Sequence, residues 1–191
     1  MGLLVQSMAI EMPVVERHPN RAEFRGVLTF VDVPSDKPPS GAKGHRVVLT
    51  KKAADDALPS LLGMALDYAP SLDRHDARMK IGVITSAEAV KVKKPTLGSA
   101  KDGAPAWMIE VAGYLFARDF PEVISEMRAA GRDVLGMSYE IADARIEDMK
   151  APVWVITSCT FTGAALLKRD KAAYRNTYIE LVERKPPVSV R

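Results

Sequence analysis

The chain has 191 residues, a length that fits one ordinary domain with short tails, and its 27 Lys and Arg nearly balance its 24 Asp and Glu. A net charge of +3 is small for a dedicated nucleic-acid-binding protein, and a hydrophobic share of 47% predicts a folded core. The single cysteine, Cys159, excludes an internal disulfide and a cysteine-based zinc cluster, and no apolar run approaches the roughly 18 residues that cross a bilayer.

Residue patterns in the first part of the chain predict an N-terminal arm, a strand, a loop rich in proline and glycine, a second strand and a helical region. These elements are expected at residues 1–20, 23–33, 34–44, 45–50 and 51–68. Thr50 is placed to cap the helical region, and Pro59 is expected to divide it into two short helices.

The second part of the chain predicts four strands and two helices. Strands are expected at 79–90, 107–119, 134–147 and 153–162, a loop at 93–105, helices at 120–131 and 165–177, and a tail at 185–191. The order of these elements predicts an α+β domain over residues 21–184. We expect a mostly antiparallel, β-barrel-like sheet of about six or seven strands with three or four surrounding helices.

Sequence motifs give no sign of a bound nucleotide or metal. Neither glycine-rich phosphate-binding pattern is present, and His18, His45 and His75 lie too far apart for a local metal motif. The sequence therefore predicts no cofactor and no metal.

Ser138 and His75 are the candidates for nucleophilic catalysis. Serine is unusual in the middle of an apolar strand, and Gly136, two residues earlier, permits a bulge or a close approach of backbones. His75 stands among charged residues at the start of a predicted strand, where an imidazole can act as a base. The alternatives are a half-buried strand serine bonded to a neighbour and a solvated loop histidine. Cys159 is the alternative nucleophile, but its place in the middle of a strand is typical of an inert core cysteine.

Four segments, taken in order, resemble the prohead maturation proteases of tailed phages, which are related to the herpesvirus assemblins. They are FRGVLTFVD at 24–32, RHDARMKIGVIT at 74–85, LGMSYEI at 135–141 and VITSCTFTGAALL at 155–167. The resemblance implies that Ser138 is the nucleophile of a serine endopeptidase and that His75 is its general base.

The resemblance leaves the third catalytic residue open. The related enzymes have an acid or a second histidine in the strand after the nucleophile, whereas this chain has Ser158 at the closest position. Glu140 competes for the place, because it lies two residues from Ser138 on the same face of the strand. The spacing of the related enzymes also implies that Arg169 stabilises the oxyanion.

The implied function is cleavage of phage major capsid and scaffold proteins inside the procapsid, in the host cytoplasm, without a membrane or a specific nucleic acid as partner. Self-cleavage is expected in the segments 1–20 and 185–191. Related proteases form dimers, so a homodimer is an alternative to a monomer. The missing acid leaves open a catalytically weak or inactive assembly module that binds scaffold, and an unrelated β-barrel binding domain is a third interpretation.

Overall fold

The computed structural model of the chain describes residues 18–76, 78–92, 107–131 and 133–182. The expected loop at 93–105, the tail at 185–191 and most of the N-terminal arm, residues 1–17, lie outside the described residues. No helix in these described ranges is long and apolar enough to cross a membrane.

The described residues form eight strands, two α-helices and one 3-10 helix, which confirms an α+β fold. The elements are β1 (Arg21–Val31), β2 (Arg46–Leu49), α1 (Lys51–Ala57), η1 (Leu58–Leu61), β3 (Ala65–Tyr68), β4 (Lys80–Lys91), β5 (Trp107–Phe116), α2 (Pro121–Ala129), β6 (Leu135–Ile146), β7 (Val153–Lys168) and β8 (Tyr178–Leu181).

All eight strands belong to one sheet, in which the long strand β7 has the largest number of neighbours. The order is β2-β7-β3-β4-β5-β1-β8, and β6 lies along the other edge of β7. The pairs β2–β7 and β3–β7 are parallel, and the remaining pairs are antiparallel. The sheet is therefore mixed: five of its seven strand pairs are antiparallel, and the two parallel pairs, both on β7, were not expected.

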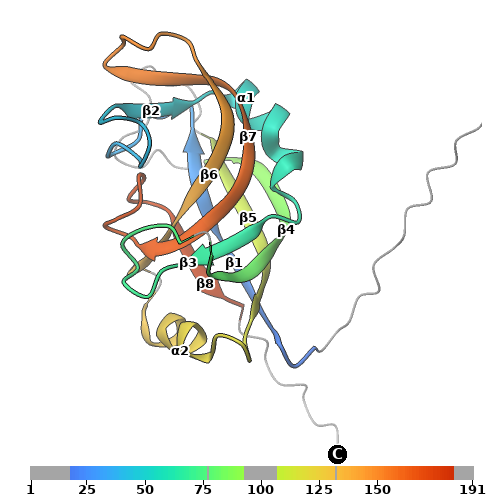
Figure 1. Cartoon of the computed structure of the whole chain (residues 1–191). Helices are drawn as coiled ribbons and strands as arrows, with labels where there is room; N and C mark the ends of the chain where they lie inside the picture. The colour runs from blue at the N-terminus through green and yellow to red at the C-terminus, as the bar shows by residue number, and fades with distance from the viewer. Residues whose placement is uncertain (1–17, 77, 93–106, 132, 183–191) are drawn as a thin grey trace, which may run out of the picture.

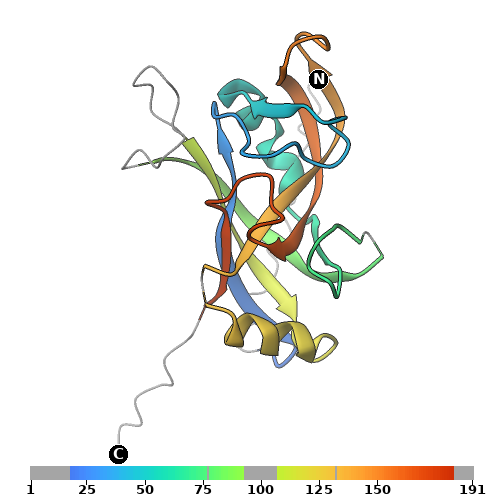
Figure 2. The same ribbon diagram turned by 90° about the vertical axis from the view of Figure 1, so that its left-hand side faces the viewer.

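The sheet is strongly curled, so that its inner face encloses the core. β6 crosses back toward β1 and β8 and contacts both (Figure 1). The most completely buried large side chains come from many strands, among them Phe24, Leu66, Ile81, Ile109 and Phe161. Figures 1 and 2 show α1 and α2 near opposite ends of the curled sheet rather than as a layer over it.

The helical region predicted for 51–68 is wrong in its second half. Thr50 caps α1 as expected, because its hydroxyl accepts a hydrogen bond from the amide of Ala53. The α-helix ends at Ala57, η1 contains Pro59, and the chain then enters strand β3. β3 lies between β4 and β7, so its backbone is paired on both sides, and this pairing overrides the local helical pattern.

The helix predicted for 165–177 is also wrong. The strand expected at 153–162 extends to Lys168, because β3 and β6 pair with its second half on either side. The segment after β7 forms turns that fold against β1 and β2, where the hydroxyl of Tyr174 donates to the carbonyl oxygen of Val33. Two α-helices are therefore found in the described residues, fewer than the three or four expected.

Candidate active site

A row of neighbouring residues on three strands forms the floor of the candidate active site. Ser138 on β6 pairs with Ala165 on β7, and Ala165 pairs with Asp67 on β3. Glu140 pairs with Gly163, which lies two residues before Ala165 on β7. Side chains of directly paired residues point to the same face of a sheet, so Ser138, Glu140 and Asp67 share one face. The small residues at the β7 positions between them leave space above the sheet.

His75 enters this space from the loop between β3 and β4. The loop is anchored by Leu72, which is buried and whose carbonyl oxygen accepts a hydrogen bond from the amide of Lys168 at the end of β7. Beyond His75, the Asp76 carboxylate binds the backbone amide and the guanidinium of Arg78. These contacts fix both ends of the short segment that carries the imidazole.

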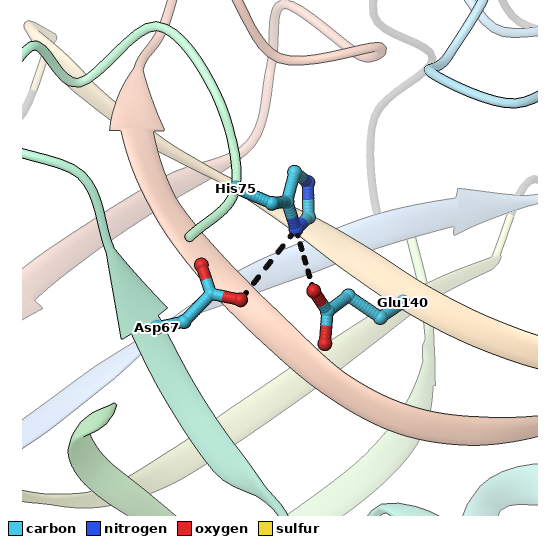
Figure 3. Close-up of side chains that lie close together, drawn as sticks. All are labelled: Asp67, His75 and Glu140. Carbon is cyan, nitrogen blue, oxygen red and sulfur yellow. Dashed lines mark hydrogen bonds and ion pairs between the residues drawn. The ribbon is translucent and has the colours of Figure 1, made fainter. Parts of the chain in front are cut away.

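The His75 ring presents one nitrogen to two carboxylates, as Figure 3 shows. Its Nδ1 lies 3.1 Å from Oε1 of Glu140 and 3.8 Å from Oδ2 of Asp67. The first distance is a hydrogen bond, and with an ionised Glu140 it favours the neutral tautomer that carries its proton on Nδ1. The second ring nitrogen, Nε2, lies on the side away from both carboxylates. This arrangement leaves the lone pair of Nε2 available to a third group.

Asp67 is a buried carboxylate without a hydrogen bond. Its side chain has 0% exposure, and neither oxygen has a hydrogen-bond partner within the described part of the chain. The nearest cationic group besides His75 is the ammonium of Lys80, whose Nζ lies 3.9 Å from Oδ2. Burying a carboxylate without a hydrogen bond costs free energy of folding, so the presence of Asp67 at this position calls for a reason other than stability.

Burial and the neighbouring charged groups shift the pKa of His75 and of Glu140. Burial disfavours a charged His75 ring, but the neighbouring Asp67 and Glu140 outweigh burial, so the pKa of His75 lies above its ordinary value. Burial raises the pKa of the Glu140 carboxyl, and the negative charge of Asp67 raises it further, against the opposing influence of His75. The cluster thus favours a positive charge on the imidazole.

Two glycines make close approaches that position the site. A Cβ on Gly163 would lie 2.7 Å from Oε2 of Glu140, so this glycine makes room for the carboxylate. A Cβ on Gly136 would lie 2.8 Å from the hydroxyl oxygen of Thr177, which accepts a hydrogen bond from the amide of Met137. The same Cβ would lie 3.2 Å from Cα of Arg169, so the close approach of backbones expected at Gly136 is confirmed. Gly136 lies two residues before Ser138 on β6.

Ser138, His75 and Glu140 line one pocket of about 780 Å³. Arg74 contributes a cationic side chain to its lining, and the pocket continues along an apolar wall. That wall includes Val47, Ile141, Ile146, Trp154 and Ile156. A hydroxyl, an imidazole and a carboxylate thus border a cavity large enough for the side chains of a peptide.

The other sequence-predicted site residues lie elsewhere. Ser158 is exposed on β7 and pairs with Arg145, and it is not among the residues that line the pocket. Arg169 uses its guanidinium to bind the carboxylate of Asp133 and the carbonyl oxygen of Arg175. Of the two competing third members, the structure places Glu140 beside His75.

Asp67 is the site residue that the sequence analysis missed. It fell within the region 51–68 that was expected to be helical, where an acidic residue is unremarkable. The available signal was its position between Leu66 and Tyr68, four residues after Gly63. A carboxylate inside a short apolar strand is unusual enough to mark a functional candidate.

Comparisons of the chain with protein-family models, with curated proteins and with solved structures found no match.

Proposed function

We propose that this protein is a serine endopeptidase in which Ser138 is the nucleophile, His75 the general base and Glu140 the acid that orients the base. The observation that carries the proposal is the hydrogen bond between Nδ1 of His75 and Glu140 in a pocket that Ser138 also lines. A hydroxyl, an imidazole and a carboxylate around one cavity form the pattern of activated nucleophiles.

In the proposed reaction, Nε2 of His75 takes the proton of Ser138 as its Oγ attacks a peptide carbonyl carbon. The carbonyl oxygen becomes an oxyanion, and His75 becomes an imidazolium that Glu140 and Asp67 stabilise. The C–N bond then breaks, and Nε2 returns its proton to the leaving amine. Water, activated by the same nitrogen, hydrolyses the acyl-enzyme ester and regenerates Ser138.

Arg74 is the proposed partner of the oxyanion. It lines the pocket next to His75, whereas the guanidinium of Arg169 already binds Asp133 and Arg175. A cation close to the developing negative charge stabilises the transition state. Replacement of Arg74 by Gln is therefore expected to slow acylation more than replacement of Arg169.

The biological substrates we propose are the major capsid and scaffold proteins of a tailed phage, cleaved inside the procapsid in the host cytoplasm. The support is the resemblance of four ordered segments to the prohead maturation proteases. The alternative of a catalytically weak or inactive, scaffold-binding module is motivated by the missing acid in the strand after the nucleophile, and the hydrogen bond between Glu140 and His75 favours the active enzyme over it.

A fluorophosphonate probe tests the proposed nucleophile. The intact mass of the wild-type chain should increase by one probe adduct, located on Ser138 by peptide mapping, and Ser138→Ala and His75→Gln should not react. Ser86→Ala, which removes an exposed hydroxyl from β4, should react like wild type. Among the third-member variants, Glu140→Gln should slow the reaction and Ser158→Ala should not. An unreactive wild-type protein that is folded would contradict the proposal.

Self-cleavage is tested by the mass of the purified chain over days. The proposed cut regions, 1–20 and 185–191, would yield products that are shorter by the corresponding segments, and Ser138→Ala would stay intact. A constant wild-type mass under conditions in which the probe reacts would contradict self-processing alone.

A further inference from the structure

The cluster of Asp67, His75 and Glu140 has the composition of a metal site as well as that of a catalytic triad. One ligand atom from each residue lies within 4.8 Å of the other two. One imidazole nitrogen with carboxylate oxygens is a donor set that suits zinc, whereas Mg²⁺ prefers oxygen ligands alone.

Two of the three separations are close to the spacing of ligands around a small cation, and the third, between the two carboxylates, is within 4.8 Å. In a tetrahedral zinc site with N and O ligands, neighbouring ligand atoms lie about 3.3–3.5 Å apart. The Nδ1 atom of His75 lies 3.1 Å from Oε1 of Glu140 and 3.8 Å from Oδ2 of Asp67, which bracket that spacing. Completing three ligands would require the carboxylates of Asp67 and Glu140 to turn toward a common point beside Nδ1.

The unpartnered Asp67 carboxylate is an independent sign of a cationic ligand. Both of its oxygens are buried without a hydrogen bond, and the side chain faces the ring of His75 (Figure 3). The ring of His75, at 3.8 Å, and the ammonium of Lys80, at 3.9 Å, are both too far from Oδ2 for a hydrogen bond. A divalent cation would supply the direct contacts that these oxygens lack.

Exposure of the other two ligands gives the metal a route to the site. The side chains of His75 and Glu140 are 24% and 23% exposed, and both border the pocket. A fourth coordination position would face the cavity and take a water molecule, as in zinc sites with three protein ligands.

We propose that Asp67, His75 and Glu140 together bind one Zn²⁺ ion and that the bound metal reversibly switches off the serine nucleophile. Metal binding uses the lone pair of Nδ1, so the ring proton moves to Nε2. With a proton on Nε2, His75 has no lone pair to accept the proton of Ser138. The zinc-bound and catalytically competent states therefore exclude each other; this regulatory part rests on the proposed function, whereas the binding part does not.

Calorimetric titration of the chelator-treated full-length chain with zinc sulfate tests the binding part. We expect one ion per chain, and a loss of affinity of at least about 100-fold in Asp67→Asn and in Glu140→Gln, since each removes a direct ligand. Ser138→Ala and Asp56→Asn should bind like wild type, because Asp56 carries an exposed carboxylate on α1. Circular dichroism establishes that each variant is folded, and zinc should raise the melting temperature of wild type but not of Asp67→Asn.

Three outcomes would overturn the metal site: no binding by wild type, unchanged binding by both folded ligand variants, or Mg²⁺ binding tighter than zinc.

The regulatory part is tested with the fluorophosphonate probe. Saturating zinc should abolish modification of wild type, and EDTA should restore it. Bound zinc without loss of modification would overturn the regulation and keep the site, whereas a wild-type chain that never reacts, with or without zinc, would overturn the protease and leave the titration to decide the metal.

Discussion

Gly163 offers a test of the proposed catalytic geometry at a residue that carries no chemistry itself. In Gly163→Ala, the new Cβ would lie 2.7 Å from Oε2 of Glu140, whereas ordinary contacts begin at 3.4 Å. The carboxylate must therefore retreat by about 0.7 Å, the difference between these two distances. Its hydrogen bond to His75 is 3.1 Å long, so a movement of this size breaks or badly bends the bond.

The expected consequence is a large loss of reactivity with little loss of stability. A misplacement approaching 1 Å in a catalytic group costs about 100-fold in rate, equivalent to about 2.7 kcal/mol of transition-state stabilisation. Alanine in place of glycine in a strand gains about 0.5–1 kcal/mol. This gain offsets part of the steric cost of about 1–3 kcal/mol, part of which arises at the carbonyl oxygen of Ala65, 3.1 Å from the new Cβ.

The assay is the rate of fluorophosphonate modification, measured together with urea denaturation. Gly131→Ala is the matched control, because a Cβ there would meet nothing within 4 Å. A double-mutant cycle with Glu140→Gln separates the two explanations: if Gly163 acts through the carboxylate, the double variant reacts as fast as Glu140→Gln alone. A folded Gly163→Ala that reacts at the wild-type rate would refute the proposed positioning of Glu140.

Two further predictions concern buried groups. Burial raises the pKa of the Cys159 thiol to about 11, so at pH 8 only about one molecule in a thousand carries a thiolate. Iodoacetamide should therefore modify the native chain at least about 100-fold more slowly than free cysteine. Rapid modification of the folded protein would contradict the burial of Cys159. Asp67→Asn should raise the free energy of unfolding, measured in urea, by about 1–3 kcal/mol, because it removes a buried charge that has no hydrogen bond. The two neighbouring cations do not lose a necessary partner, since His75 can be neutral and Lys80 can reach water. A destabilised variant would mean that His75 and Lys80 already stabilise the Asp67 carboxylate well.

The sequence predicted those parts of the fold and site that depend on local patterns. Alternation of residues located most of β1, β4, β5 and β6, and the same alternation placed Ser138 and Glu140 on one face. The helix assigned to 165–177 failed because the segment after Gly163 has small and aliphatic residues that suit either structure, and pairing with β3 and β6 decided for a strand. Asp67 was not predicted as a site residue because local patterns do not show tertiary pairing, and only the parallel pairing of β3 with β7 brings Asp67 next to His75.

The arrangement around β7 has a consequence for when the candidate site assembles during synthesis. β2 pairs with β7 through Arg46 and Val153, positions that are more than a hundred residues apart, and β3 pairs with β7 across a similar stretch of chain. Such long-range parallel contacts form slowly and late. Ser138 and Glu140 leave the ribosome before β7, the strand that joins β6 to β3. The residues of the candidate site are therefore brought together only after β7 has been synthesised.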